Sequence, residues 1–92
     1  MPKILAIFSQ KMKASIEISM YPLDQDYGNQ ILGFIKELNT HPELTVRTNS
    51  MSTQIFGEYD LLMDIMQKEI KTVFSTTDTV VMVLKIVNQD LS

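Results

Sequence analysis

Cysteine and tryptophan are absent from this 92-residue chain, and histidine occurs once. Without cysteine the chain can form no disulfide framework and no thiolate metal site, and it has no thiol nucleophile. This composition is compatible with a reducing compartment, and we expect a cytoplasmic protein. Glycine is also scarce. The three glycines stand apart at Gly28, Gly33 and Gly57, so the sequence contains no glycine-rich phosphate loop.

The single histidine, His41, precedes Pro42 in a stretch that ends a predicted helix, and we expect it at the surface. A Ser-His-Asp set could be built only around this residue, and nothing in the sequence resembles one. Asp24 and Asp26 lie close together, but their segment lacks the later ligands of a calcium loop. We expect them to cap the following helix. The sequence therefore proposes no metal, no cofactor and no enzyme.

Excess positive charge and long apolar runs are missing as well. The net charge is −3 and the lysines and arginines are scattered, which argues against nucleic acid as a partner. The apolar run from Ile4 to Phe8 is too short for a signal-peptide core or a membrane span. We therefore expect no membrane insertion, and we treat residues 1–12 as an N-terminal leader of uncertain structure.

Hydrophobic periodicity divides the remaining chain into six elements. Alternating patterns predict strands at about 14–21, 43–49, 51–57 and 79–87, and apolar stripes predict helices at about 26–39 and 59–74. The order β-α-β-β-α-β is that of the ferredoxin-like fold, an α+β architecture. Right-handed crossovers place both helices on one face of a four-stranded antiparallel sheet, with the first and third strands in its centre. Residues 13–92 are thus predicted to form one ferredoxin-like ligand-binding domain.

The last strand is apolar on both faces. Val80, Met82, Leu84 and Ile86 alternate with Val81 and Val83, and Lys85 alone interrupts the second row. A sheet face exposed to solvent normally carries polar residues. The simplest cover for an apolar sheet face without helices is a second copy of the same sheet. We therefore expect a homodimer or homotetramer that assembles through sheet faces.

The stretch "ASIEISMYPL", residues 14–23, places a carboxylate in the middle of a central strand. Glu17 lies on the face opposite Ile16 and Ile18, which is the face that a partner would cover. A covered carboxylate needs a partner, and Arg47, Lys85 or a cationic ligand could provide it. A carboxylate at a wet sheet margin, or one in an intersubunit salt bridge, is the alternative.

Two stretches, "SIEISMYPL" and "MSTQIFGEYD", resemble the thiamine-binding proteins related to YkoF. The family pattern is a strand that ends in Tyr-Pro-Leu before a helix, and later a strand that holds a Thr and ends in Gly plus an acid. The matching positions here are Tyr21, Pro22, Leu23, Thr53, Gly57 and Glu58. The resemblance covers about residues 13–87. It implies a ferredoxin-like domain that binds thiamine or its hydroxymethylpyrimidine half and that assembles through its sheets.

The resemblance also implies site residues. Thiamine combines a cationic thiazolium with a flat aminopyrimidine, and a site for it needs a carboxylate, an aromatic wall and a few hydroxyls or amides. The residues that match these needs are Glu17, Ser19, Tyr21, Asn49, Thr53 and Gln54. Thr53 is two residues from Ile55, so the two side chains lie on the same face of the strand. Two positions of the pocket are therefore open: at the strand ends between sheet and helices, with Tyr21 at its rim, or between two sheets if a bulge near Ser50 changes the face on which Thr53 lies.

These observations favour a non-enzymatic binding protein for thiamine or hydroxymethylpyrimidine. One alternative is a small regulatory module that senses another metabolite at a subunit interface. The other is a cofactor-free dimeric oxygenase-like or isomerase-like enzyme. The sequence disfavours the enzyme because it lacks tryptophan and because His41 lies in a loop.

Overall fold

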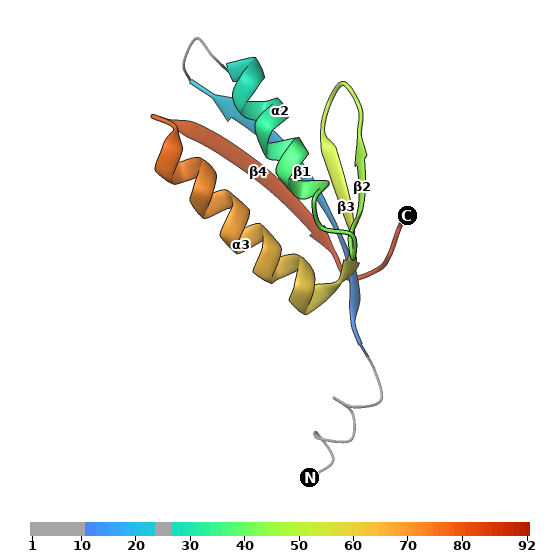
Figure 1. The fold of residues 1–92 in the computed structure, drawn as a ribbon. Helices are drawn as coiled ribbons and strands as arrows, with labels where there is room; N and C mark the ends of the chain where they lie inside the picture. The colour runs from blue at the N-terminus through green and yellow to red at the C-terminus, as the bar shows by residue number, and fades with distance from the viewer. Residues whose placement is uncertain (1–10, 24–26) are drawn as a thin grey trace.

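The computed structural model describes residues 11–23 and 27–92. The elements follow the predicted order: β1 (Lys13–Pro22), α2 (Tyr27–Leu38), β2 (Thr45–Thr48), β3 (Thr53–Glu58), α3 (Tyr59–Thr76) and β4 (Val80–Val87). The strands form one antiparallel sheet in the order β2-β3-β1-β4. Both helices lie on one face of this sheet (Figure 1). The predicted ferredoxin-like fold is confirmed. Most of the predicted leader and the two aspartates expected to cap the helix lie outside the described residues.

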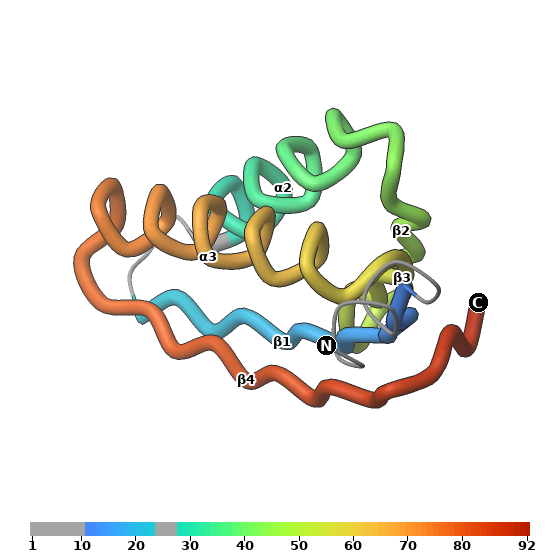
Figure 2. The backbone as a smooth tube through the Cα atoms, turned by 90° about the horizontal axis from the view of Figure 1, so that it is seen from below, coloured from blue at the N-terminus to red at the C-terminus, as the bar shows by residue number. Residues whose placement is uncertain are grey.

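The core lies between the helices and the helix-facing side of the sheet. Figure 2 shows the two layers, with α2 and α3 on one side of β1 and β4. Across the sheet, Ile16 of β1 stands opposite Ile55 of β3 and Ile86 of β4. Leu38 and Leu62 reach this layer from the two helices and are fully buried. Ile16 and Ile55 are fully buried as well, whereas Ile86 near the end of β4 is half exposed. Full burial of one such side chain contributes about 1.5–3 kcal/mol of hydrophobic free energy.

The strand register fixes which side chains share a face. Thr53 and Ile55 pair with Ile18 and Ile16 and therefore face the helices, in a ladder without a bulge. Glu17 stands opposite Gln54 on one side and Lys85 on the other, on the open face. Thr53 thus shares a face with Ile55, as the sequence indicated, and Thr53 and Glu17 lie on opposite faces of the sheet.

Gly57 and Glu58 shape the junction between β3 and α3. A Cβ at Gly57 would lie 3.4 Å from Leu44 Cδ2, at the close limit of ordinary van der Waals contact. Glu58 is the N-cap of α3, and its carboxylate accepts a hydrogen bond from the Asp60 N–H. Glu58 of the resemblance therefore has a structural role, and Gly57 packs closely against Leu44.

His41 is not the surface residue that the sequence predicted. Its Nε2 lies 3.1 Å from Oε2 of Glu69, and both side chains are largely enclosed. Glu69 lies on the buried side of α3, where an ionised carboxylate requires a partner. The loop after α2 supplies that partner, so His41 fastens this loop to α3.

The C-terminal tail crosses one end of the open face. The Ser15 hydroxyl donates to the Gln89 carbonyl at 2.6 Å and accepts from the Leu91 N–H at 2.9 Å. Leu91 and Phe56 line the same small cavity there, and Phe56 is only 5% exposed although it stands on the open face. The tail therefore buries Ser15 and completes the cover of Phe56.

We expect Ser15→Ala to lower the free energy of unfolding by about 1–2 kcal/mol, because it removes both hydrogen bonds that hold the tail. Denaturant unfolding measures this loss, and hydrogen exchange should rise at the Leu91 amide. Ser19→Ala is the matched control on the same strand. Equal stability of Ser15→Ala and wild type would contradict the role assigned to the tail.

Candidate functional site

A cavity of about 540 Å³ opens where β1 extends beyond β3. The β1–β3 ladder ends at the pair Ile18–Thr53, whereas β4 stays paired with β1 as far as Pro22. The end of β1 therefore has a free edge on its β3 side. The cavity lies between this edge, α2 and the tip of the β2–β3 hairpin, and it is lined by residues 18–23, 31, 34, 35 and 48–53.

One wall of the cavity is apolar. Ile31, Phe34 and Ile35 of α2 face Ile18 and Met20 of β1 across it. These three helix residues belong to the apolar stripe that predicts the helix at about 26–39. Phe34 is buried, and Ile31 and Ile35 are half-buried at this end of the molecule, where the sheet narrows to β1 and β4. The same stripe therefore serves both core and cavity.

The opposite wall is the tip of the β2–β3 hairpin, residues 49–52, and hydrogen bonds of Asn49 hold its shape. The Asn49 side-chain oxygen accepts hydrogen bonds from the N–H groups of Met51 at 2.8 Å and Ser52 at 3.0 Å. Its own N–H donates to the Ser52 carbonyl, which closes the hairpin. Such an Asx turn is a common way for asparagine to order a loop. Asn49 thus shapes the cavity through its oxygen, and its NH₂ group is the part that can donate to a ligand.

Two threonine hydroxyls lie next to the tip on the helix-facing side of the sheet. Thr48 Oγ1 and Thr53 Oγ1 are 3.2 Å apart, and Thr53 is buried. Each hydroxyl can donate one hydrogen bond and accept two. The pair therefore offers hydrogen-bonding capacity to a ligand at the edge of the apolar wall.

The backbone of Met20 adds a further polar group. The Leu23 N–H donates to the Thr79 carbonyl, so the odd-numbered residues of β1 hydrogen-bond toward β4. By the same alternation, Met20 directs its N–H and C=O toward the β3 side. The ladder on that side has already ended at Ile18 and Thr53. Met20 therefore presents an adjacent donor and acceptor to the cavity.

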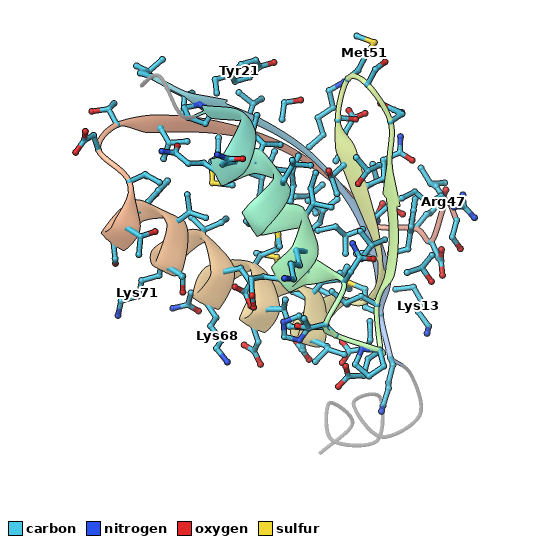
Figure 3. The ribbon with its side chains drawn as sticks, turned by 45° about the horizontal axis from the view of Figure 1, so that its top comes forward. Lys13, Tyr21, Arg47, Met51, Lys68 and Lys71 are labelled. Carbon is cyan, nitrogen blue, oxygen red and sulfur yellow. The ribbon has the colours of Figure 1, made fainter. Side chains whose placement is uncertain are left out.

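The structure brings four of the six predicted site residues to this cavity: Ser19, Tyr21, Asn49 and Thr53. Tyr21 is 54% exposed, as expected of a residue at the rim. Figure 3 shows Tyr21 and Met51 at the same end of the molecule, on β1 and at the hairpin tip. The cavity is also lined by residues that were not predicted from the sequence: Thr48, Ser50, Met51 and Ser52. Their loop carries no periodic signal, and only the turn residues Asn49 and Ser50 could have indicated it.

The other two predicted residues lie on the open face. Glu17 and Gln54 line a second cavity of about 210 Å³ there, with Phe56, Lys85 and Leu91 among its other residues. The larger cavity and this one are therefore separate in their lining, and Glu17 belongs to the smaller.

Glu17 has two partners. Its Oε2 accepts a 2.8 Å hydrogen bond from the Ser52 hydroxyl, and its Oε1 lies 3.5 Å from Nζ of Lys85. The hydrogen bond from Ser52 is the main cause that lowers the pKa of Glu17, and the charge of Lys85 lowers it further. Lys85 is 77% exposed, so this ion pair adds little stability. Arg47, the other partner considered from the sequence, instead stacks over the Phe56 ring.

Within residues 11–23 and 27–92, no group of three or more His, Asp or Glu side chains could hold a metal ion. No helix of the described part is long and apolar enough to cross a membrane.

Solved structures of similar fold come from several organisms. A structural-genomics protein of Streptococcus pneumoniae is 30% identical with a TM-score of 0.77, and the match covers 87% of this chain and 90% of that one. A hypothetical protein of Methanocaldococcus jannaschii is 26% identical with a TM-score of 0.72, covering 88% and 84%. A Thermotoga maritima protein described as a candidate for thiamine biosynthesis or salvage is 18% identical with a TM-score of 0.74, covering 84% of each chain.

No curated protein matches the chain. The sequence model of the family described as thiamine-binding protein matches residues 16–90, which include most of β1, the other three strands, both helices and the hairpin tip. This match agrees with the resemblance of the Tyr-Pro-Leu and Gly-Glu segments. The chain belongs to the thiamine-binding protein family.

Proposed function

We propose that this chain is a cytoplasmic, non-enzymatic binding protein for thiamine or its hydroxymethylpyrimidine moiety. The observation that carries the proposal is the 540 Å³ cavity, which joins an apolar wall to hydroxyl groups and a free strand edge. Its volume falls within the range of about 300–1,000 Å³ that is typical of sites for small molecules. Membership of the family supports the same ligand class.

The pyrimidine half fits the chemistry of the enclosed part. Its flat ring can pack against Phe34 and the neighbouring isoleucines of α2. An aminopyrimidine carries an amine donor beside a ring-nitrogen acceptor, which is the complement of a peptide C=O beside an N–H. We assign the amine and the ring nitrogen to the backbone of Met20, and the hydroxymethyl position to the hydroxyls of Thr48 and Thr53.

The thiazolium half then extends toward the rim. Tyr21 stands there with its ring half exposed, and an aromatic face attracts a cation by about 0.5–1 kcal/mol at an exposed site. The sequence analysis expected Glu17 to supply the counter-charge. Because Glu17 lies outside the cavity lining and is engaged with Ser52, the proposal assigns the cation to Tyr21.

Binding is favoured over catalysis by the side chains at the site. Apart from the Tyr21 phenol, no described residue that lines the cavity has a titratable side chain that could serve as a general acid or base. A regulatory module for another metabolite would use the same cavity, and the choice of ligand separates that function from the proposed one.

Titration calorimetry with thiamine, hydroxymethylpyrimidine and a set of amino acids tests the proposal. We expect the first two to bind and the amino acids not to bind. Thr53→Val should weaken both ligands by about 1 kcal/mol, since it removes one hydroxyl and keeps the side-chain shape. Thr45→Val, on the exposed part of β2, is the control. A wild-type protein that binds neither thiamine nor hydroxymethylpyrimidine would refute the proposed function.

We also propose that two or four copies assemble through their open sheet faces. Val81, Val83 and Val87 expose apolar surface on this face, and no helix of the described chain covers it. Apolar surface of this kind is stabilised by burial against a second apolar layer. The central Glu17–Lys85 pair would then lie within the interface.

Val83→Asp should dissociate the assembly, because it would bury an unpaired charge in the interface. Light scattering at micromolar concentration measures the mass of each protein. Leu32→Asp is the matched control, since Leu32 is exposed on α2 away from the sheet. A wild-type protein that scatters as a single 10.5 kDa chain would contradict the assembly.

A further inference from the structure

Glu17 and the ligand cavity are linked by a single side chain. Ser52 lines the cavity, and its hydroxyl donates to Oε2 of Glu17 at 2.8 Å. Glu17 itself projects on the open face and does not line that cavity. A carboxylate on one side of the sheet is thus bonded to a residue of the wall that encloses the proposed ligand.

The hairpin tip extends beyond the paired part of the sheet. β2 is an edge strand of four residues, and the last pairing of β3 with β1 is at Thr53. The hydrogen bonds from Asn49 to Met51 and Ser52 give the tip its shape, but they run within the tip. They cannot fix its position relative to β1. The bond between Ser52 and Glu17 can, because it joins the tip to the middle of β1.

We propose that Glu17 is a positioning residue of the ligand site. Through Ser52 it holds the hairpin tip at a fixed distance from the free edge of β1, and so it sets the width of the cavity into which the pyrimidine enters. This inference rests on the proposed function. It differs from the role that the sequence suggested, because Glu17 then acts on the wall of the site, whatever the charge of the ligand.

The environment of Glu17 suits this role. The Ser52 hydrogen bond and the nearby Lys85 both lower the pKa of Glu17, so the carboxylate is ionised at neutral pH. A hydrogen bond to an ionised acceptor is roughly twice as strong as one between neutral groups. Lys85 contacts the other carboxylate oxygen and leaves Oε2 to Ser52.

The test compares cationic thiamine with neutral hydroxymethylpyrimidine in four proteins: wild type, Ser52→Ala, Glu17→Gln and the double variant. We expect Ser52→Ala to weaken both ligands by the same factor, about tenfold. Glu17→Gln keeps a weaker neutral acceptor and should weaken both equally, by about threefold. The double variant should bind no more weakly than Ser52→Ala, because both changes break one bond.

A control separates positioning from charge. Glu43→Gln makes the same charge change as Glu17→Gln at an exposed site, and it should bind both ligands within about twofold of wild type. Hydrogen exchange at the Met51 and Ser52 amides should accelerate in Ser52→Ala and Glu17→Gln, and should stay at the wild-type rate in Glu43→Gln. A loss of fold stability alone would not produce this localised pattern.

Three results would overturn the inference. A selective loss of thiamine in Glu17→Gln, with Ser52→Ala unaffected, would make Glu17 the direct counter-charge. Additive losses in the double variant would mean that Ser52 contacts the ligand by itself. Unchanged affinities in all variants would remove Glu17 and Ser52 from the site while leaving the proposed function intact. Absence of binding by wild type would refute the proposed function. Hydrogen exchange would still test whether the bond between Ser52 and Glu17 holds the hairpin tip in place.

Discussion

The site depends on a difference in length between the two central strands. β1 has ten residues and β3 has six, and their shared ladder stops at Ile18 and Thr53. Beyond that pair, β1 stays paired with β4 as far as Pro22. Because β3 has ended, the Met20 peptide groups have no strand partner on that side, and the sheet narrows to β1 and β4. A backbone with unused hydrogen-bonding groups beside an apolar helix face is the basis of the proposed pyrimidine site.

The sequence predicted the fold well because its elements are strongly periodic. The apolar stripe through Phe34 and Leu38 marked α2 to within one residue at each end. Alternation in β1 and β4 indicated which side chains face the helices, and the strand register agrees with it. The hairpin strands were predicted too long, 43–49 and 51–57 against Thr45–Thr48 and Thr53–Glu58. The local alternation of apolar and polar residues does not show at which residue a turn ends the pairing of two strands.

The remaining features depend on contacts between distant residues. Ser15 binds the carbonyl of Gln89, 74 positions away, and the tail that carries it has no periodic pattern to indicate its path. His41 is half-buried against Glu69 because α3 turns that carboxylate inward, and neither residue type suggests this contact from sequence. The division of the predicted site is different, because alternation along the strands already indicated it. Glu17 and Thr53 were assigned together by the chemistry of the ligand, and the strand register places them on opposite faces of the sheet.

The central claim is that the cavity at the end of β1 holds the pyrimidine. Amide chemical shifts recorded by NMR during a titration with hydroxymethylpyrimidine test it most directly. The account predicts that the largest shifts fall on Met20, Thr53 and the Phe34 turn of α2, with small changes on the open face. Largest shifts at Gln54, Phe56 and Lys85 would place the ligand in the smaller cavity instead, and would contradict the account.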